Sequence, residues 1–306
     1  MIRPVRFASN AETAASNAFQ VVPAGSDEGE LQRRALAEFD GLAESLRAAG
    51  VRVHVIDDTP EPHTPDSLFP NNWVSFHASG TVVLYPLLTP NRRAEVRLDV
   101  LERVEEESGW RWPNRVDLTG LHERGAILEG TGSLVLDRTH RLAYACRSPR
   151  TTPAGLEEFA QRMGYEPVVF GALDEGGVEI YHTNVVMGIG SSFAVVCLES
   201  IRNATERSMV EGRLRETGHE LIAISLEQLG HFAGNCLALE SAAGEPLVAL
   251  SEQALASLDG EQRERLAIHA RIVSAPLDTI ESVGGGSARC MLAELHEPTG
   301  YSSSRA

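Results

Sequence analysis

The feature that most constrains this chain is a local pattern that occurs five times at nearly constant spacing. Each copy is a short loop rich in Asn and Gly, followed by an apolar run, a turn and usually a second apolar run. The residues directly before the five apolar runs lie 51–60 residues apart: Asn72, Gly132, Asn184, Asn235 and Arg289. Spacing of this size is typical of repeated supersecondary units. The chain is therefore predicted to consist of five copies of one structural unit.

Each unit is predicted to contain a β-hairpin, a helix and a further strand. The second strands of four hairpins are predicted over Thr81–Tyr85, Arg141–Cys146, Phe193–Leu198 and Pro246–Leu250. Helical periodicity follows them over Ala94–Glu107, Gly155–Gly164, Ser208–Gly218 and Gly260–Ala270. Three of these helices lead into β-rich runs at Tyr165–Phe170, Glu220–Ser225 and Arg271–Pro276. A hairpin–helix–strand unit is a mixed α/β arrangement.

The two ends of the sequence are expected to meet. A helix over Leu31–Ala49 and a strand over Val51–Ile56 precede the first loop. The fifth hairpin has no second strand after Leu295, and the segment Pro4–Ala8 is predicted to supply it. This closure predicts one domain over residues 1–306, an α/β propeller of five blades around a pseudo-fivefold axis. The repeat outweighs the length of 306 residues, which alone would suggest two domains.

Charge and cysteine usage limit the partners and the compartment. The chain has 27 Lys and Arg against 43 Asp and Glu, a formal net charge of −16. Such a surface repels phosphate backbones and anionic lipids, so neither nucleic acid nor a membrane is expected as partner. The four cysteines lack CxxC spacing and the histidines lack metal-ligand spacing, so no metal is expected. These features predict a cytoplasmic protein, and a homo-oligomer is kept open as its form of assembly.

Equivalent positions of repeated units arranged in a ring lie at the same end and face the same axis. The residues expected to converge there are Asn71, Asn72, Glu129, His182, Asn184, Asn235, Cys236, Arg289 and Cys290. A Cys, a His and a Glu from separate units can act as nucleophile, acid/base and orienting carboxylate. Taken singly, each has an ordinary structural explanation in the core or on the surface. Their shared position in the repeat favours catalysis.

Two cysteines compete for the role of nucleophile. Cys290 is preferred over Cys236 because three glycines, Gly284–Gly286, and Arg289 precede it. Glycines let a substrate approach the backbone, and a neighbouring cation lowers the pKa of a thiol. Cys146 and Cys197 fall inside predicted strands and are expected in the core.

Several short motifs, specific in their combination and in their order along the chain, resemble those of the pentein superfamily of guanidine-modifying enzymes. The segment Gly284-Gly-Gly-Ser-Ala-Arg-Cys290-Met resembles its nucleophile motif, and Glu129-Gly-Thr-Gly resembles its Glu-Gly-Gly-Asp segment. His182-Thr-Asn184 resembles its His-Leu-Asp, and Ser148-Pro-Arg150-Thr resembles its Ser-x-Arg-Thr. Phe69-Pro-Asn-Asn-Trp stands in the place of its Phe-x-Arg-Asp. With Asn17-Ala-Phe-Gln20, the chain is most similar to the amidinotransferase-related subgroup that contains citrulline-utilisation hydrolases.

The resemblance implies a five-bladed α/β propeller and a covalent mechanism that needs no cofactor. Cys290 would attack the planar carbon of a guanidino or ureido group, His182 would transfer protons, and Glu129 would support His182 or hold nitrogens. Arg150 would bind the substrate's α-carboxylate. Asn71, Asn72, Asn184 and Arg289 are expected to bind substrate, and Asn17 and Gln20 to belong to a lid.

The chain differs from the arginine deiminases of this superfamily at two positions, and this difference predicts that the reacting group of the substrate is neutral. Asn72 and Asn184 occupy positions where arginine deiminases have aspartates that bind a guanidinium. Carboxamides complement a neutral ureido group, which has both donors and an acceptor, better than a cation. Citrulline, hydrolysed to ornithine, ammonia and CO2, is therefore the expected substrate. The alternatives are an arginine or methylarginine hydrolase, an amidinotransferase, and an inactive propeller scaffold.

Overall fold

The computed structural model describes residues 1–14, 17, 19–20 and 27–299, which contain four three-stranded sheets and one two-stranded sheet. The first sheet is β3 (Val74–His77), β4 (Thr81–Leu84) and β5 (Asn114–Asp117). The second is β6 (Val135–Asp137), β7 (Leu142–Cys146) and β8 (Glu166–Phe170). The third is β9 (Met187–Ile189), β10 (Phe193–Val196) and β11 (Glu220–Ala223). The fourth is β12 (Leu237–Glu240), β13 (Pro246–Ser251) and β14 (Arg271–Ala275).

These four sheets share one topology, which confirms the predicted unit in four of its five copies. The first two strands of each form an antiparallel hairpin, as in the pairing of Phe76 with Val82. The third strand pairs in parallel with the second, as β8 does with β7. A parallel neighbour requires a crossover, which a helix supplies in each unit.

The helices that make these crossovers are amphipathic or capped by local sequence signals. They are α2 (Leu98–Ser108), α4 (Pro153–Met163), α6 (Ala204–Glu216) and, with the short α8 (Glu252–Ser257), α9 (Gly260–His269). The Thr152 side chain accepts the Gly155 N–H to start α4, and Gly164 ends that helix in the left-handed conformation. The expected helix boundaries agree with these to within about four residues.

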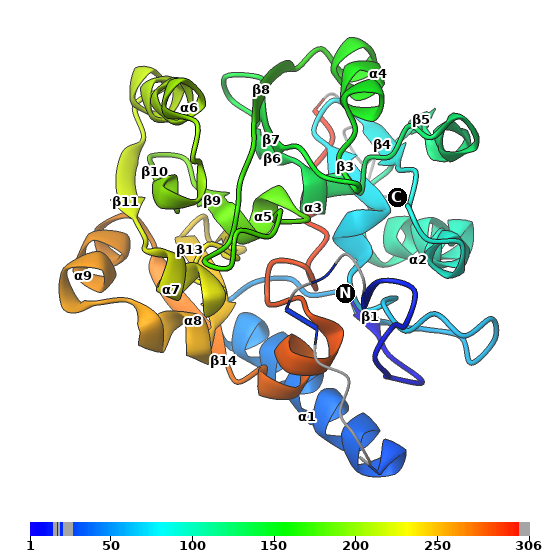
Figure 1. Cartoon of the computed structure of the whole chain (residues 1–306). Helices are drawn as coiled ribbons and strands as arrows, with labels where there is room; N and C mark the ends of the chain where they lie inside the picture. Colours follow the sequence, from blue (N-terminus) through cyan, green and yellow to red (C-terminus); the bar gives the residue numbers. More distant parts are fainter. Residues whose placement is uncertain (15–16, 18, 21–26, 300–306) are drawn as a thin grey trace.

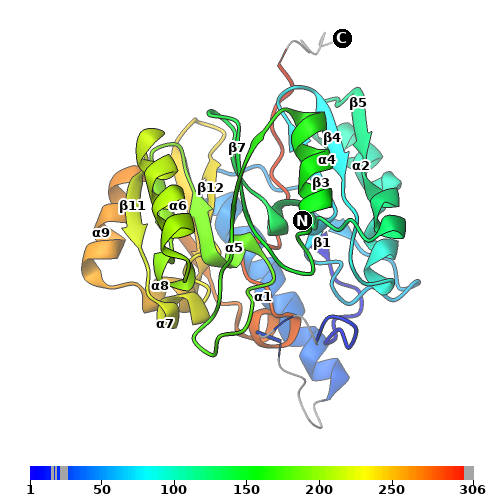
Figure 2. The same ribbon diagram turned by 45° about the horizontal axis from the view of Figure 1, so that its top comes forward.

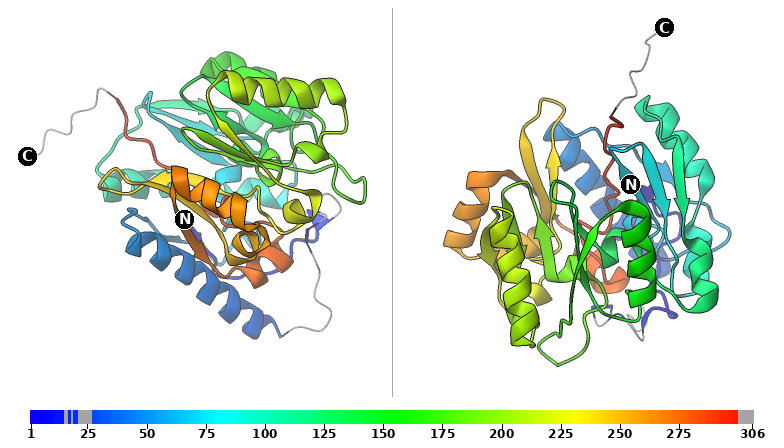
Figure 3. Two further views of the ribbon diagram at one scale, coloured as in Figure 1. Left: turned by 90° about the vertical axis from the view of Figure 1, so that its left-hand side faces the viewer. Right: turned by 90° about the horizontal axis from the view of Figure 1, so that it is seen from above.

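The shared architecture of the units places short helical turns near the middle of the molecule and long helices outside. Immediately before the hairpins lie η2 (Pro70–Asn72), α3 (Gly130–Ser133) and α5 (Thr183–Val186). Figure 1 shows α3 and α5 near the centre, while α1 (Glu28–Ala48), α2, α4, α6 and α9 lie at the periphery. The view from above shows the same outer helices around the strands (Figure 3). The remaining helical turns are η3 (Asn91–Glu95), η4 (Thr119–Arg124), η5 (Leu198–Ser200), α7 (Leu226–Gly230) and η6 (Ile280–Gly284).

The prediction that Pro4–Ala8 completes the fifth hairpin is wrong. The two-stranded sheet is instead a parallel pair of β1 (Ile2–Arg3) and β2 (Ile56–Asp57), so the strand expected over Val51–Ile56 is also mostly absent. The Gln32 side chain of α1 accepts the Phe7 N–H and donates to the Pro4 carbonyl at 3.0 Å. Part of the hydrogen-bonding capacity of residues 4–8 is thus satisfied by a helix side chain rather than by a strand.

The segment that follows Cys290 runs between the sheets instead of forming a strand. It rises from the end of η6 towards the opposite end of the molecule (Figure 2, red). There the Thr299 N–H donates to the Ala78 carbonyl at 2.7 Å, at the turn between β3 and β4. Met291 and Leu292 are buried in the apolar cluster that also contains Phe39 of α1. Burial of apolar side chains therefore holds this segment without sheet pairing.

No helix within the described ranges combines the length and the apolar character needed to cross a membrane.

Candidate active site

The loops before the hairpins pack so closely that glycine is required at two of their positions. A Cβ on Gly130 would lie 2.2 Å from the Asn71 carbonyl oxygen, and the residue has a φ of +48°. A Cβ on Gly132 would lie 2.5 Å from Asn72 Nδ2 and 2.8 Å from two atoms of the His182 ring. These contacts bring the loops of the first three units together.

Cys290 lies in the turn after the three glycines and is buried. Its backbone N–H donates to the Ser287 carbonyl at 2.9 Å. Its Sγ lies 3.3 Å from Asn184 Nδ2 and 3.3 Å from Asn235 Nδ2, side chains of the third and fourth units. The predicted nucleophile is therefore in contact with two of the residues that the repeat predicted to converge.

His182 and Glu129 form a buried pair in the same cluster. His182 Nε2 lies 2.8 Å from Glu129 Oε2. Because the carboxylate accepts, Nε2 carries the hydrogen and Nδ1 is left as the nitrogen that exchanges protons. Burial lowers the pKa of His182 to about 4, although the hydrogen bond to Glu129 opposes that shift. The imidazole is therefore neutral at pH 7 and able to accept a proton.

Glu129 is an ionised carboxylate whose charge is already balanced. Its Oε1 accepts the Leu88 N–H at 3.0 Å, and its Oε2 lies 3.3 Å from Arg92 Nη1 and 3.5 Å from Arg150 Nη1. Burial favours the protonated form, but Arg150, Arg92 and His182 together hold the pKa of Glu129 well below its usual range. The carboxylate can therefore orient the imidazole and stabilise its protonated form.

The amide side chains expected to bind substrate are all buried beside this pair. Asn72 Nδ2 donates to Asn71 Oδ1 at 2.9 Å, which links the two neighbours. Among the described residues, Asn71 Nδ2 and Asn184 Oδ1 are buried without a hydrogen-bond partner. A buried polar atom without a partner costs free energy, so a ligand that satisfies both atoms would recover it.

Arg150 lies where its guanidinium faces the same cluster. Besides Glu129, its Nη2 contacts the Thr13 carbonyl at 3.4 Å, and its guanidinium carbon lies 4.8 Å from the centre of the Tyr181 ring. Thr13 belongs to the segment that contains the expected lid residues. Asn17 Nδ2 donates to the Gly285 carbonyl at 3.2 Å, and Gln20 bonds to Asn10 and Thr13 of its own segment. Asn17 therefore contacts the nucleophile loop, whereas these contacts of Gln20 hold the segment itself.

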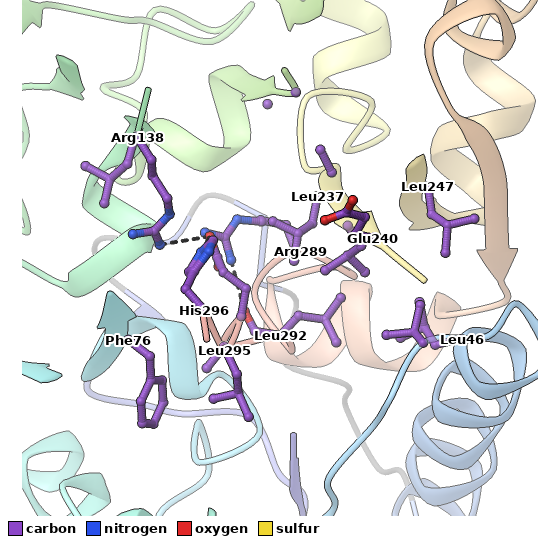
Figure 4. Close-up of a pocket in the computed structure, with 18 of the residues that line it drawn as sticks. Leu46, Phe76, Arg138, Leu237, Glu240, Leu247, Arg289, Leu292, Leu295 and His296 are labelled. Atoms are coloured by element: carbon purple, nitrogen blue, oxygen red, sulfur yellow. Dashed lines mark hydrogen bonds and ion pairs between the residues drawn. The ribbon is translucent and has the colours of Figure 1, made fainter. Parts of the chain in front are cut away.

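The expectation that Arg289 faces the thiol and the substrate is wrong. Its Nη1 donates to the Leu292 carbonyl at 2.9 Å and its Nη2 lies 3.1 Å from Glu294 Oε2. Figure 4 shows the guanidinium in a pocket with Arg138 and His296. That cavity has a volume of about 1030 Å³, and of the described residues that line it none is Cys290, His182 or Glu129. In this turn the side chains of residues 289 and 290 diverge, so Arg289 anchors the loop from the far side.

Arg138 and Arg289 in that pocket both pair with the carboxylate of Glu294, and this shared ion pair is expected to stabilise the fold. Glu294 bridges Arg138 and Arg289, each at 3.1 Å. Burial opposes ionisation, yet Arg289, His296 and Arg138 hold the pKa of Glu294 well below its usual range. Glu294→Gln is expected to lower the free energy of unfolding by about 3 kcal/mol at pH 7, measured by urea denaturation. The stabilisation is complete above the ordinary Glu pKa of about 4.3 and is lost as the pH falls below it.

Glu297→Gln is the matched control, because Glu297 is exposed on the same segment. We expect a change within about 0.5 kcal/mol for this variant. Equal stabilities of wild type and Glu294→Gln at pH 7 would contradict the anchoring role of Arg289.

Two charged side chains beside Glu129, those of Arg92 and Asp66, are not predicted from the sequence. Arg92 of η3 is buried, makes a two-point ion pair with Glu95 at 2.9 Å, and also contacts Glu129 and Asp66. Asp66 accepts the Asn10 amide at 2.8 Å through Oδ2, and its Oδ1 is buried without a partner among the described residues. Asp66 could have been found because it lies three residues before the Phe69 motif. Arg92 belongs to no motif or periodic pattern that would have pointed to it.

The other three cysteines lie elsewhere and are unsuited to attack. Cys146 and Cys197 are buried in the core, as expected from their strands. Burial raises the pKa of Cys236 to about 12, and this residue lines the pocket on the far side with Arg289. The described residues contain no group of three or more His, Cys, Asp or Glu side chains that could hold a metal ion.

Comparison with known proteins gives one family and a set of structural neighbours. The family model described as N,N-dimethylarginine dimethylhydrolase, eukaryotic, matches residues 3–297. The chain has no significant match among curated proteins. The N-terminal domain of ArgZ, an arginine dihydrolase from the ornithine–ammonia cycle in cyanobacteria, is 19% identical over 97% of both chains, with a TM-score of 0.74.

Two further solved structures show the same mixed α/β fold. AgrE in a binary complex with L-arginine is 19% identical over 97% of this chain and 40% of its own, with a TM-score of 0.72. Dimethylarginine dimethylaminohydrolase with an S-methyl-L-thiocitrulline adduct is 14% identical over 95% and 96% of the chains, with a TM-score of 0.60. At these identities the likeness establishes the fold.

Proposed function

The chain belongs to the N,N-dimethylarginine dimethylhydrolase family of the pentein superfamily, hydrolases of guanidino C–N bonds, and we propose that it hydrolyses the ureido group of citrulline or a close ureido amino acid. Cys290 is the nucleophile, His182 the acid/base and Glu129 the orienting carboxylate. The proposal includes one domain of five blades, in which the β1–β2 pair and the segment after Cys290 take the place of a complete fifth sheet. Cytoplasmic location and homo-oligomerisation stay predictions of the sequence.

The reaction proceeds in two addition–elimination steps. The Cys290 thiol gives its proton to His182, and the sulfur adds to the ureido carbon. Elimination of the terminal nitrogen, protonated by His182, breaks the C–N bond, releases ammonia and leaves a thiocarbamate on Sγ. Water, deprotonated by His182, then displaces the sulfur to give a carbamate, which decomposes to ornithine and CO2. The neutral imidazole beside Glu129 suits both proton transfers, and no step requires a cofactor.

The observation that carries the proposal is the unsatisfied pair of amide atoms. Asn184 has a buried acceptor oxygen and Asn71 a buried donor nitrogen without partners among the described residues. A ureido group has N–H donors for the first and a carbonyl acceptor for the second, whereas a guanidinium has donors only. The charge of Glu129 is balanced by Arg92 and Arg150, so the contacts of the site favour a neutral group.

The amino-acid end of the substrate is assigned to the charged residues around Arg92. The unsatisfied Asp66 Oδ1 is available for an α-ammonium group. Arg150 presents a planar fork that suits the α-carboxylate, as its resemblance to the Ser-x-Arg-Thr arginine implies. Asp66 and Arg150 both contact Thr13, so an anion and a cation lie close enough to bind the α-ammonium and the α-carboxylate that one carbon of an amino acid carries.

Arginine or methylarginine hydrolysis is the second candidate, favoured by the comparisons rather than by the amides. The family model is named for dimethylarginine, and the ArgZ and AgrE neighbours are described with arginine. A water molecule in place of the ureido carbonyl would satisfy Asn71 in that case.

The ratio of kcat/KM for citrulline over arginine decides between the candidates. We expect the wild type to favour citrulline by roughly 10²-fold or more, because an unmatched charge or donor in a buried site is heavily penalised. The double variant Asn72→Asp with Asn184→Asp is expected to move the ratio towards arginine by supplying carboxylates. Ammonia and ornithine are measured for citrulline, arginine and methylated arginines, with and without an acceptor amine. A wild type that prefers arginine, or a ratio that the double variant leaves unchanged, would contradict the assignment to citrulline.

A further inference from the structure

Asn235 of the fourth repeat contacts the nucleophile loop and its neighbour through both atoms of its buried amide group, and its Oδ1 also lies 3.8 Å from Cys290 Sγ. Its side chain is fully buried. Nδ2 donates to the Asn184 carbonyl at 3.0 Å and lies 3.3 Å from Cys290 Sγ, while Oδ1 accepts the Arg289 N–H at 3.0 Å. One amide therefore joins the backbone of the third unit, the backbone before the nucleophile and the sulfur atom itself.

The orientation of this amide follows from its partners. Oδ1 must face the Arg289 N–H, and the two hydrogens on Nδ2 must face the Asn184 carbonyl and the sulfur. If the oxygen and nitrogen were exchanged, the NH2 group would face the Arg289 N–H and the oxygen would face the Asn184 carbonyl, so neither hydrogen bond could form. The side-chain N–H of Asn235 that points to Sγ is therefore held in place by two backbone groups, the Asn184 carbonyl and the Arg289 N–H.

The fourth loop is held rigidly around this residue. The backbone N–H of Asn235 donates to the Phe232 carbonyl at 2.8 Å. Phe232 itself has a φ of +60°, a conformation that non-glycine residues rarely adopt. A Cβ on Gly234 would lie 2.4 Å from the Val185 carbonyl oxygen, so this loop packs directly on α5. Strained backbone and close packing of this kind fix a side chain that must be placed accurately.

The sulfur atom needs such donors because the cations of the cluster are engaged elsewhere. His182 Nε2 is bound to Glu129, and the guanidinium of Arg289 faces Glu294 on the far side. Arg92 contacts Glu95, Asp66 and Glu129. The polar contacts that the described residues make with Sγ are the amides of Asn184 and Asn235.

We propose that Asn235 is a catalytic residue that stabilises the Cys290 thiolate through an N–H···S hydrogen bond and aims Sγ at the substrate carbon. The Asn184 amide supplies the second donor. Two uncharged donors stabilise the anionic sulfur in addition to the imidazolium that forms when His182 takes the thiol proton. This assignment rests on the proposed role of Cys290 as nucleophile.

Asn235→Asp keeps the acceptor for the Arg289 N–H and replaces the NH2 group by a carboxylate oxygen. The neutral variant Asn235→Ser, which is too short to reach Sγ, is measured beside it, because it removes the donor without adding a negative charge next to the sulfur. The measured quantity is the rate of iodoacetamide labelling of Cys290 between pH 6 and 10, followed by peptide mass spectrometry. We expect the midpoint of the pH–rate profile to rise by about one pH unit or more, since a hydrogen bond to a charged group is lost. At pH 7, kcat/KM is expected to fall about 10–100-fold, with partial recovery at higher pH.

Asn203→Asp is the matched control, because Asn203 caps the exposed start of α6 and Asp serves equally well there. Its labelling profile and kcat/KM should equal those of the wild type. If Asn235→Asp does not fold, as judged by circular dichroism, Asn235→Ser carries the test alone with the same expectation.

The outcomes separate this inference from the proposed function. A wild type in which Cys290 is not labelled selectively would contradict the nucleophile and, with it, this proposal. Selective labelling with an unchanged midpoint in a folded Asn235 variant would overturn the role of Asn235 alone. A lowered melting temperature without a shifted profile would assign Asn235 to structure only.

Discussion

Cys290→Ala is expected to lower kcat by roughly 10⁴–10⁶-fold, the range seen when a nucleophile is removed from a catalytic unit. The sulfur is the atom on which the two amides of Asn184 and Asn235 converge, whereas the competing cysteine, Cys236, lines the far pocket. Turnover is measured by ammonia release from citrulline and arginine. Wild-type enzyme quenched during turnover should carry a covalent adduct on the peptide that contains Cys290.

Cys236→Ala is the control for this prediction, since Cys236 neighbours the site in sequence pattern but lines the far pocket in the fold. We expect it to keep most of the activity. An adduct on the Cys236 peptide, or a Cys290→Ala enzyme that retains turnover, would transfer the nucleophilic role to the other cysteine.

The repeat makes much of this site predictable from the sequence. Strand-type and helix-type hydrophobic patterns alternate along the chain. The observed positions of β7, α4 and β8 therefore lie close to those that the sequence predicts. Equal spacing also implies that Glu129 and His182 meet, although 53 residues separate them. Chemistry-bearing residues at equivalent repeat positions are therefore located by symmetry rather than by local propensity.

The features that the sequence does not predict depend on side-chain directions and on single tertiary contacts. Periodicity cannot show that the Arg289 guanidinium turns away from the residue that follows it, towards Glu294. Nor can it show that Gln32 bonds two backbone groups of residues 4–8, the Pro4 carbonyl and the Phe7 N–H, where a strand is expected. Arg92 is hidden for the same reason, because only the fold shows that its charge is buried among Asp66, Glu95 and Glu129.

His182→Ala is expected to lower kcat by on the order of 10²–10⁴, the usual contribution of a positioned acid/base. Burial lowers the pKa of His182 to about 4, so the group is neutral through the physiological range and ready to take the thiol proton. The imidazolium formed after that transfer is stabilised by Glu129 at 2.8 Å and can then protonate the leaving nitrogen. Steady-state kinetics with citrulline and arginine measure kcat and KM separately.

His182→Gln sharpens this test, because the amide can still donate to Glu129 but cannot exchange protons at pH 7. We expect it to lose as much kcat as His182→Ala, whereas a purely orienting role would leave it nearly active. His219→Gln is the control, since His219 is also buried but bonds to Thr217 and the Gly190 carbonyl, far from Glu129 in the hydrogen-bond network. A loss confined to KM in both His182 variants would make His182 a binding residue, and the proton transfers would then need another group beside Cys290.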